Sequence, residues 1–245
     1  MSRYVLLPAF PLDSRIWNNV VDLLQSAGHE VLTPDIGGLG TSDIPAVAPS
    51  VDAMASQVAA AIDSAGWTSA HVGGISMGGY VAMATLRMYP ERVDGLGLVC
   101  TKASMDSPAK RLERLQQATD MDSAALAVMA RSMSIALVGT NKVMSEHVCE
   151  WIQEQSPAAV AWCLRAMAAR PDSLGVLRTA GSRRVAVVSG EDDVIATEQD
   201  VHHITAALAD ARAKVSSVRL PGVGHLAVLE DPHSVADTLL TMSAS

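Results

Sequence analysis

Short apolar runs alternate along the chain with longer amphipathic segments, which is typical of strands alternating with helices. The runs that predict β-strands lie at residues 4–7, 30–33, 70–73, 96–100, 185–189 and 214–220. Helical periodicity falls between them, at residues 17–26, 51–65, 78–88, 196–211 and 233–243. This alternation predicts an α/β fold in which helices cover both faces of a largely parallel sheet.

One long segment, 105–178, breaks the alternation because it has helical periodicity and no convincing strand. Ser107-Pro108 and Ser156-Pro157 are placed like helix starts within it. We therefore expect a single domain over 1–245 with a helical cap inserted at 105–178. The alternative is that these helices only cover the sheet and take no part in function. Six of the twelve methionines fall in this segment, and methionine at helical spacing mostly fills core.

The composition fits one such domain and disfavours several kinds of partner. The chain has 245 residues, 49% of them hydrophobic, which is enough for one sizeable core. Its formal net charge of −8 repels nucleic-acid phosphates and anionic membrane surfaces, so a small molecule is the expected partner. The basic patch at 110–114 is interpreted as a solvated helix face, with a functional patch as the alternative.

Cysteine usage and the chain's first residues are typical of a reduced, cytoplasmic protein. Cys100, Cys149 and Cys163 are an odd, widely spaced set, and the sequence opens without a secretory pattern. No apolar run approaches the roughly 18 residues of a membrane helix, and no CxxC or HExxH motif is present. We expect no membrane span, no metal and no cofactor. The oligomeric state is left open.

The strongest chemical signal is Gly74-Ile75-Ser76-Met77-Gly78, which joins the strand at 70–73 to the helix at 78–88. A serine held on so sharp a turn needs small residues two positions away on either side, as Gly74 and Gly78 are. The structural alternative is an N-cap serine in a glycine-rich turn.

Two further segments favour a nucleophile over an N-cap. Asp193 follows the strand at 185–189, and His225 follows the strand at 214–220 through a glycine loop. Because the carboxyl ends of parallel strands share one edge of a sheet, the three residues can converge there. Their order along the chain, serine, aspartate, histidine, is the order of a known hydrolase arrangement. Asp192 competes with Asp193 as the acid.

With these three residues in this order, the chain resembles the α/β-hydrolase superfamily along nearly its whole length. The matching pieces are Pro8-Ala9-Phe10-Pro11 with Trp17, Thr33-Pro34-Asp35 with 38–43, the Ser76 turn, 190–193, and Gly224-His225 with Glu230-Asp231-Pro232. The resemblance implies a mostly parallel sheet of about eight strands, flanked by helices, and an α-helical cap after the sixth strand. Within the superfamily the chain is similar to small cytoplasmic esterases, 3-oxoadipate enol-lactonase-like proteins and cofactor-free perhydrolases.

The resemblance also implies roles for these residues. Ser76 is the expected nucleophile, His225 the general base and Asp193 the acid that orients the imidazole, since the family places this acid three residues after Gly190. The backbone N–H groups of Phe10 and Met77 are expected to form the oxyanion hole. The sequence departs from the family at residues 8–9, where Pro-Ala replaces the usual His-Gly, so we expect the loop to lack the hydrogen bonds that this histidine would make.

We therefore expect a serine hydrolase that cleaves a carboxylic ester, or a related enol-lactone or thioester, through an acyl-enzyme. Perhydrolysis or haloperoxidase chemistry, C–C bond hydrolysis and ligand binding without turnover are the alternatives. We expect the cap to favour small or medium, mainly apolar acyl groups. The candidates for the substrate pocket are Trp17, Met129, Met133 and Trp162. The other histidines lack a comparable loop and are expected to have no catalytic role.

Overall fold

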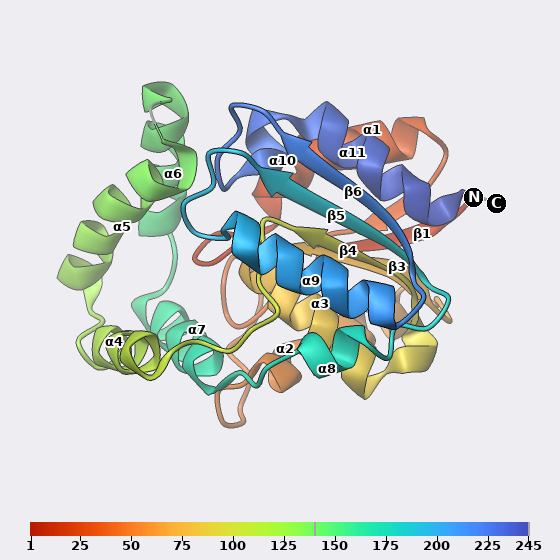
Figure 1. Ribbon diagram of the computed structural model, residues 1–245. Helices are drawn as coiled ribbons and strands as arrows, with labels where there is room; N and C mark the ends of the chain where they lie inside the picture. The colour runs from red at the N-terminus through yellow and green to blue at the C-terminus, as the bar shows by residue number, and fades with distance from the viewer. Residues whose placement is uncertain (140, 245) are drawn as a thin grey trace.

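The computed structural model describes residues 1–139 and 141–244, in which a parallel six-stranded sheet forms the centre (Figure 1). The spatial order of its strands is β2-β1-β3-β4-β5-β6. Residues 140 and 245, which fall within the ranges expected for the cap and the domain, lie outside the described residues. The strands are β1 (Arg3–Leu7), β2 (Glu30–Leu32), β3 (Ala70–Ile75), β4 (Val93–Val99), β5 (Arg184–Gly190) and β6 (Lys214–Leu220).

Six strands are present in the described part of the chain where the resemblance implied about eight. Each strand that the apolar runs predicted is found within about three residues of its expected bounds. The number eight rested on the resemblance alone, because the sequence supplies only six strand-like runs. The helical segment consequently follows the fourth strand, β4, and not the sixth.

Burial explains why the central strands are nearly continuous apolar runs. Every residue of β3 is buried, as are six of the seven in β5, whereas the edge strand β6 is mostly exposed or half-buried. Parallel strands that are covered on both faces need apolar side chains on both. The core therefore lies on either side of β1, β3, β4 and β5.

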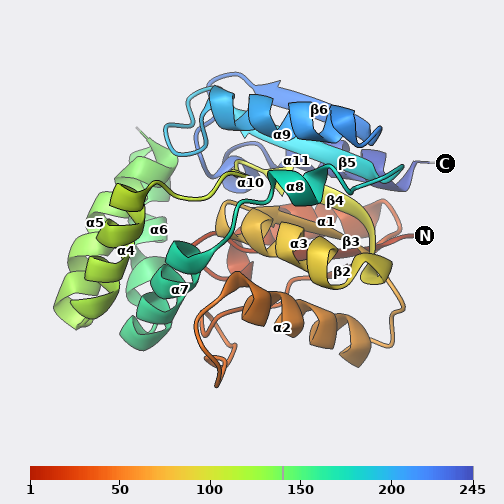
Figure 2. The same cartoon turned by 60° about the horizontal axis from the view of Figure 1, so that its bottom comes forward.

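Helices cover both faces of the sheet (Figures 1 and 2). One face is covered by α2 (Val51–Ser64), α3 (Met77–Met88), α8 (Leu174–Leu177) and α9 (Glu198–Asp210). The other face is covered by α1 (Asn18–Ser26) and α11 (Pro232–Leu240), with the short α10 (Ala227–Glu230) just before α11. Three 3₁₀ turns complete the description: η1 (Ser14–Trp17), η2 (Pro90–Arg92) and η3 (Thr241–Ser243).

Four helices form a separate layer beside the carboxyl ends of the strands (Figures 1 and 2), and we call them the cap. They are α4 (Pro108–Thr119), α5 (Ser123–Val138), α6 (Lys142–Gln153) and α7 (Pro157–Ala169). Side chains cap three of their N-termini, since Ser107, Asp122 and Asn141 each accept a backbone N–H of the first turn. Within the cap, α4 packs on α7 and α5 packs on α6.

The expected cap range of 105–178 also includes α8, but α8 packs on α3 and α9 at the sheet.

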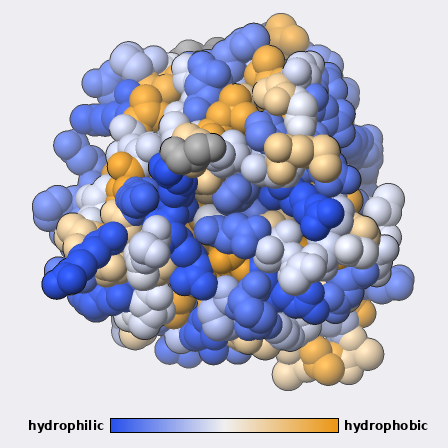
Figure 3. Space-filling model, turned by 90° about the vertical axis from the view of Figure 1, so that its right-hand side faces the viewer, coloured by the Kyte–Doolittle hydropathy of each residue, from blue (hydrophilic) through white to orange (hydrophobic). Residues whose placement is uncertain are grey.

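At the opposite end of the molecule, the face that carries the termini is mostly hydrophilic, with small separate apolar patches (Figure 3). No helix in the described residues is both long enough and apolar enough to cross a membrane.

Candidate active site

Ser76 lies on the turn between β3 and α3 in a strained backbone conformation, with φ 55° and ψ −115°. The neighbouring glycines make this turn possible. A Cβ at Gly74 would collide with the backbone of Gly78, and a Cβ at Gly78 would collide with the carbonyl group of Leu7. The turn is also fixed by Thr101, whose hydroxyl donates to the carbonyl oxygen of Ser76 at 2.7 Å.

Asp193 and His225 form a buried, hydrogen-bonded pair. Nδ1 of His225 lies 2.9 Å from Oδ1 and 2.8 Å from Oδ2 of Asp193. Oδ1 also accepts the backbone N–H groups of Ile195 and Ala196, at 2.8 and 2.9 Å. Because a carboxylate can only accept, Nδ1 of a neutral His225 carries the proton, and Nε2 is left with its lone pair.

The loop that carries His225 is held by the half-buried side chain of Glu230 and the buried side chain of Cys100. Glu230 in α10 accepts the N–H of Gly224 at 2.8 Å, and burial raises the pKa of this carboxyl group. Cys100, just after β4, donates from Sγ to the carbonyl oxygen of Gly224 at 3.9 Å. Burial, with the negative charge of Asp193 as a smaller cause, raises the pKa of the Cys100 thiol far above its usual value. Cys100 is thus an unreactive thiol that supports the loop.

Ser76 and His225 both line one cavity of about 780 Å³, a size typical of small-molecule sites. No hydrogen bond joins Oγ of Ser76 to Nε2 of His225, and Nε2 is buried without a hydrogen-bond partner among the described residues. Hydrogen bonds of this kind often become short only when substrate is bound. The serine and the histidine are therefore brought to one cavity, without a completed contact between them.

The cap supplies most of the cavity wall. Met129 and Met133, two of the expected pocket residues, line it. So do Met121 and Met167. Met129 and Met167 also belong to the buried hydrophobic core, and Met121 and Met133 pack against it, so these four methionines fill core, as expected for most of the segment, and line the cavity as well. The cavity's apolar wall also includes Phe10, Leu137, Leu164 and Ile195.

The other two expected pocket residues, Trp17 and Trp162, do not line this cavity. Trp17 is fully buried in the core next to α1. Trp162 lies on a different face of α7 from Leu164, because residues two apart in a helix point to nearly opposite sides. Its Nε1 donates instead to the carbonyl oxygen of Val47, at 3.4 Å.

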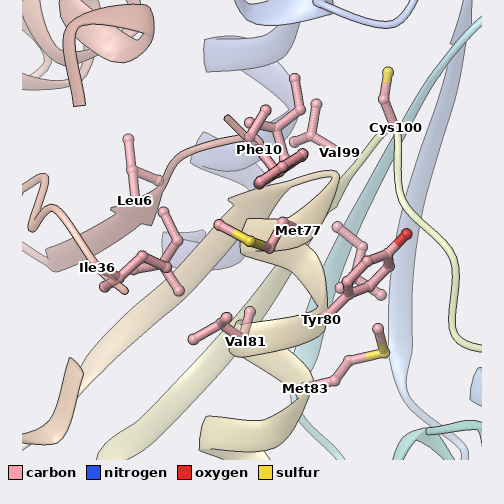
Figure 4. Close-up of a cluster of buried hydrophobic side chains, with 14 of the residues drawn as sticks. Leu6, Phe10, Ile36, Met77, Tyr80, Val81, Met83, Val99 and Cys100 are labelled. Carbon is pink, nitrogen blue, oxygen red and sulfur yellow. The ribbon is translucent and has the colours of Figure 1, made fainter. Parts of the chain in front are cut away.

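Phe10, on the loop after β1, and Met77, at the start of α3, are the expected oxyanion-hole residues and belong to the same buried cluster (Figure 4). The loop lies against the start of α3, because a Cβ at Gly78 would meet the carbonyl oxygens of Leu7 and Pro8. Met77 is the first residue of α3, so its N–H has no acceptor within the helix. The N–H of Phe10 donates to no other described residue. Although residues 8–9 are Pro-Ala in place of the family's His-Gly, the loop is closed by a backbone hydrogen bond. The N–H of Leu12 donates to the carbonyl oxygen of Ala9 at 2.8 Å.

A charged cluster at the cavity wall was not predicted as part of the site. Oδ2 of Asp106 accepts from Nε of Arg114 at 2.8 Å and from Nη1 of Arg170 at 2.7 Å. Burial alone would raise the pKa of Asp106, but the two guanidinium groups hold it below its usual value. Arg114 and Tyr80 both line the cavity. The only feature of the sequence that pointed to this cluster was the basic patch at 110–114, which contains Arg114.

The sequence of this chain matches a known protein family. The sequence model of the family described as the alpha/beta hydrolase fold matches residues 5–132, slightly more than half of the chain. The chain belongs to this family. No group of three or more histidine, cysteine, aspartate or glutamate residues in the described part of this hydrolase-fold chain could hold a metal ion.

Curated relatives match only part of this hydrolase-fold chain. A 2-hydroxy-6-oxononadienedioate/2-hydroxy-6-oxononatrienedioate hydrolase of Burkholderia vietnamiensis is 40% identical over 80 residues, which is 32% of this chain and 28% of that protein. The matches to the curated relatives span between 28% and 36% of those proteins' own lengths.

Solved structures match nearly the whole chain. A thermophilic esterase from Thermogutta terrifontis, solved with malate bound, has a TM-score of 0.90 at 28% identity, over 98% of this chain and 89% of that one. The enol-lactonase from Burkholderia xenovorans has a TM-score of 0.86 at 20% identity, over 100% and 92% of the two chains. At that identity the second likeness shows the fold alone. The expected α/β-hydrolase fold is confirmed.

Proposed function

We propose that this protein hydrolyses carboxylic esters through Ser76, His225 and Asp193, with an acyl-enzyme intermediate. The observation that carries the proposal is the single cavity lined by Ser76, on its strained turn, and by His225, which is paired with buried Asp193. Membership of the family and the likeness to an esterase structure support it. We propose further that the enzyme works in the cytoplasm, without a cofactor, on a small molecule.

In this mechanism Oγ of Ser76 attacks the ester carbonyl carbon while Nε2 of His225 takes the hydroxyl proton. The proton then passes to the oxygen of the leaving alcohol. Asp193 keeps Nδ1 protonated and stabilises the imidazolium that forms during attack. Water, activated by His225 in the same way, releases the acid from Ser76.

The negative charge that develops on the carbonyl oxygen needs donors that are in place before the reaction. The N–H groups of Met77 and Phe10 are the proposed donors, because neither has an acceptor among the described residues. Met77 follows Ser76 directly, and the loop that carries Phe10 packs against the start of α3. Loss of one such donor costs about 3 kcal/mol of transition-state stabilisation in other enzymes.

The test is turnover of p-nitrophenyl esters of increasing acyl length by the wild-type protein and by Ser76→Ala. We expect turnover by the wild type and almost none by a folded Ser76→Ala protein. An enol-lactone, a thioester, a C–C-linked β-diketone and hydrogen peroxide with a carboxylic acid should be assayed alongside. Turnover of one of these with no turnover of any ester would contradict ester hydrolysis and identify the alternative chemistry.

A further inference from the structure

At Asp106, next to the cap wall of the cavity, two positive side chains meet one negative side chain. Asp106 is the shared acceptor of Arg114 and Arg170, so one carboxylate faces two guanidinium groups. All three side chains are largely withdrawn from solvent, with exposed fractions of 9%, 15% and 3%. Poorly solvated charges interact strongly, and the unmatched positive charge favours an additional anion.

Both Nη nitrogens of Arg170 have partners in the protein, whereas those of Arg114 have none among the described residues. Besides Asp106, Arg170 donates to the carbonyl oxygens of Met167 and Ser104, and its guanidinium lies 4.1 Å from the centre of the Tyr80 ring. Arg114 uses only Nε, and its two Nη nitrogens have no hydrogen-bond partner among the described residues. Arg114 lines the cavity, so these donors are available to a bound molecule.

The other charged residues of the cavity wall that lie on α4 or at its C-cap do not neutralise Arg114. Glu113 pairs with Lys110 at 2.9 Å, and both side chains are about half exposed. Asp120 accepts from Nε2 of Gln116 at 2.7 Å and is exposed. Neither acid forms an ion pair with Arg114 in the described chain.

Tyr80 adds a second donor beside the arginines. It lines the cavity, and its hydroxyl has no hydrogen-bond partner among the described residues. Burial raises the pKa of this phenol, while the charges of Arg170 and Arg114 lower it by less. The hydroxyl therefore keeps its proton at neutral pH and can donate. Figure 4 shows the Tyr80 side chain leaving α3 one turn beyond Met77.

We propose that Arg114 and Tyr80 bind a carboxylate of the substrate, so that the preferred ester is one that carries a free carboxylate. An arginine fork matches a carboxylate in shape and charge. The methionines and Leu164 in the same cavity fit an apolar chain between that carboxylate and the ester group. Asp106 and Arg170 are positioning residues, which hold Nε of Arg114. This inference rests on the proposed role of Ser76 as the nucleophile.

The kinetic test compares kcat/KM for p-nitrophenyl hemiesters of succinic, glutaric and adipic acids with the neutral esters of the same chain length. A second series places the carboxylate in the alcohol, as 4-acyloxybenzoates against their methyl esters. The wild type should prefer the carboxylated member in at least one series, by about tenfold, as expected for a charged hydrogen bond. Arg114→Gln should remove that preference, because kcat/KM falls by at least tenfold more for the carboxylated esters than for the neutral ones.

Arg111→Gln is the matched control, because Arg111 is exposed on the same helix, does not line the cavity and loses the same charge. It should retain the wild-type preference. Equal losses on both members of each pair in Arg114→Gln would overturn the inference and leave Arg114 as a structural partner of Asp106. A wild-type preference for the neutral esters in both series would overturn it as well.

A binding experiment separates this inference from the proposed catalysis. Pentanoate and its neutral counterpart, pentanamide, are titrated by calorimetry into the Ser76→Ala and Ser76→Ala/Arg114→Gln proteins, which need no turnover. Binding of pentanoate that weakens at least tenfold without Arg114 supports the carboxylate site even if no ester is hydrolysed. Binding that is unchanged by the loss of Arg114, or no preference for the anion, would contradict it, whatever Ser76 does.

Discussion

His225 places Nδ1 within 2.9 Å of both carboxylate oxygens of Asp193, and the pair is almost completely withdrawn from solvent. The backbone N–H groups of Ile195 and Ala196 donate to Oδ1 of the same carboxylate and help to fix it. This arrangement sets the direction of the imidazole, so that Nε2 is the nitrogen left for the cavity. Asp192, the competing acid in the sequence, is exposed and makes no side-chain hydrogen bond among the described residues.

The first prediction concerns this acid. Asp193→Asn should lower kcat by about 10³- to 10⁴-fold at neutral pH, because an amide no longer selects the tautomer or stabilises the imidazolium. Asp192→Asn is the control and should change kcat less than threefold. Steady-state kinetics on the best p-nitrophenyl ester measure both. A large loss in Asp192→Asn, with little in Asp193→Asn, would move the acid by one residue.

The second prediction is that Ser76 and His225 act as one unit. Ser76→Ala and His225→Ala should each lower kcat by several orders of magnitude, and the double variant should be scarcely worse than either. Circular dichroism confirms that each variant is folded. Losses that multiply in the double variant would mean that His225 acts independently of the serine.

The third prediction concerns the turn that holds Ser76. Gly78→Ala should lower the free energy of unfolding by about 2–4 kcal/mol, because the new Cβ meets the carbonyl group of Leu7. Gly175→Ala in α8 is the control, since a Cβ there has open space around it. Urea unfolding should show this control to be unchanged or slightly more stable. Equal stability of Gly78→Ala and the wild type would contradict the packing described for the turn.

The fourth prediction concerns stability in acid. The folded pKa of Asp106 is held below its unfolded value of about 3.9. Between these two pKa values the unfolded chain binds more protons than the folded chain. The ion pairs of Asp106 therefore stabilise the fold fully above about pH 4, and the effect is lost as the pH falls through the folded pKa. Asp106→Asn should cost about 3 kcal/mol at pH 7 and make stability fall less steeply below pH 4.

Urea unfolding between pH 2.5 and 7 measures this effect. Asp22→Asn, an exposed aspartate on α1, is the control and should follow the wild type throughout. An Asp106→Asn protein whose stability runs parallel to the wild type at all pH values would contradict the ion-pair account.

The fifth prediction is that cap methionines select the acyl chain. Met129→Ala and Met133→Ala enlarge the cavity and should shift kcat/KM toward longer acyl chains by about 3- to 30-fold. Met105→Ala is the control, because Met105 is 54% exposed and does not line the cavity. If the chain-length profile stays the same in all three variants, the cap covers the sheet without selecting substrate.

Much of the fold could be predicted because strands that are buried on both faces need apolar residues, and such runs can be seen in the sequence. Residues 185–188 form a continuous apolar run because β5 is covered on both faces of the sheet. Glycines at 74 and 78 marked the turn, because no larger residue fits beside Ser76. The number of strands was wrong where it was taken from the resemblance and not from the runs themselves.

The walls of the cavity could not be predicted in the same way. Residues 162 and 164 lie on one apolar helix, and only the packing of α7 decides which of them lines the cavity. Arg114 was part of a basic patch that looked solvated, yet its Nε is held by Asp106, eight residues earlier. Arg170, which shares that carboxylate, is 64 residues further along the chain than Asp106, too far for any local pattern to connect them.

The most direct test of the central claim is covalent labelling by a fluorophosphonate, followed by mass spectrometry of the digested protein. Such a reagent reacts with a serine that a neighbouring histidine activates. We expect one adduct, on Ser76, in the wild type, none in Ser76→Ala and labelling at least a hundredfold slower in His225→Ala. A folded wild-type protein that carries no adduct on Ser76, or one that is labelled at the same rate without His225, would contradict the account.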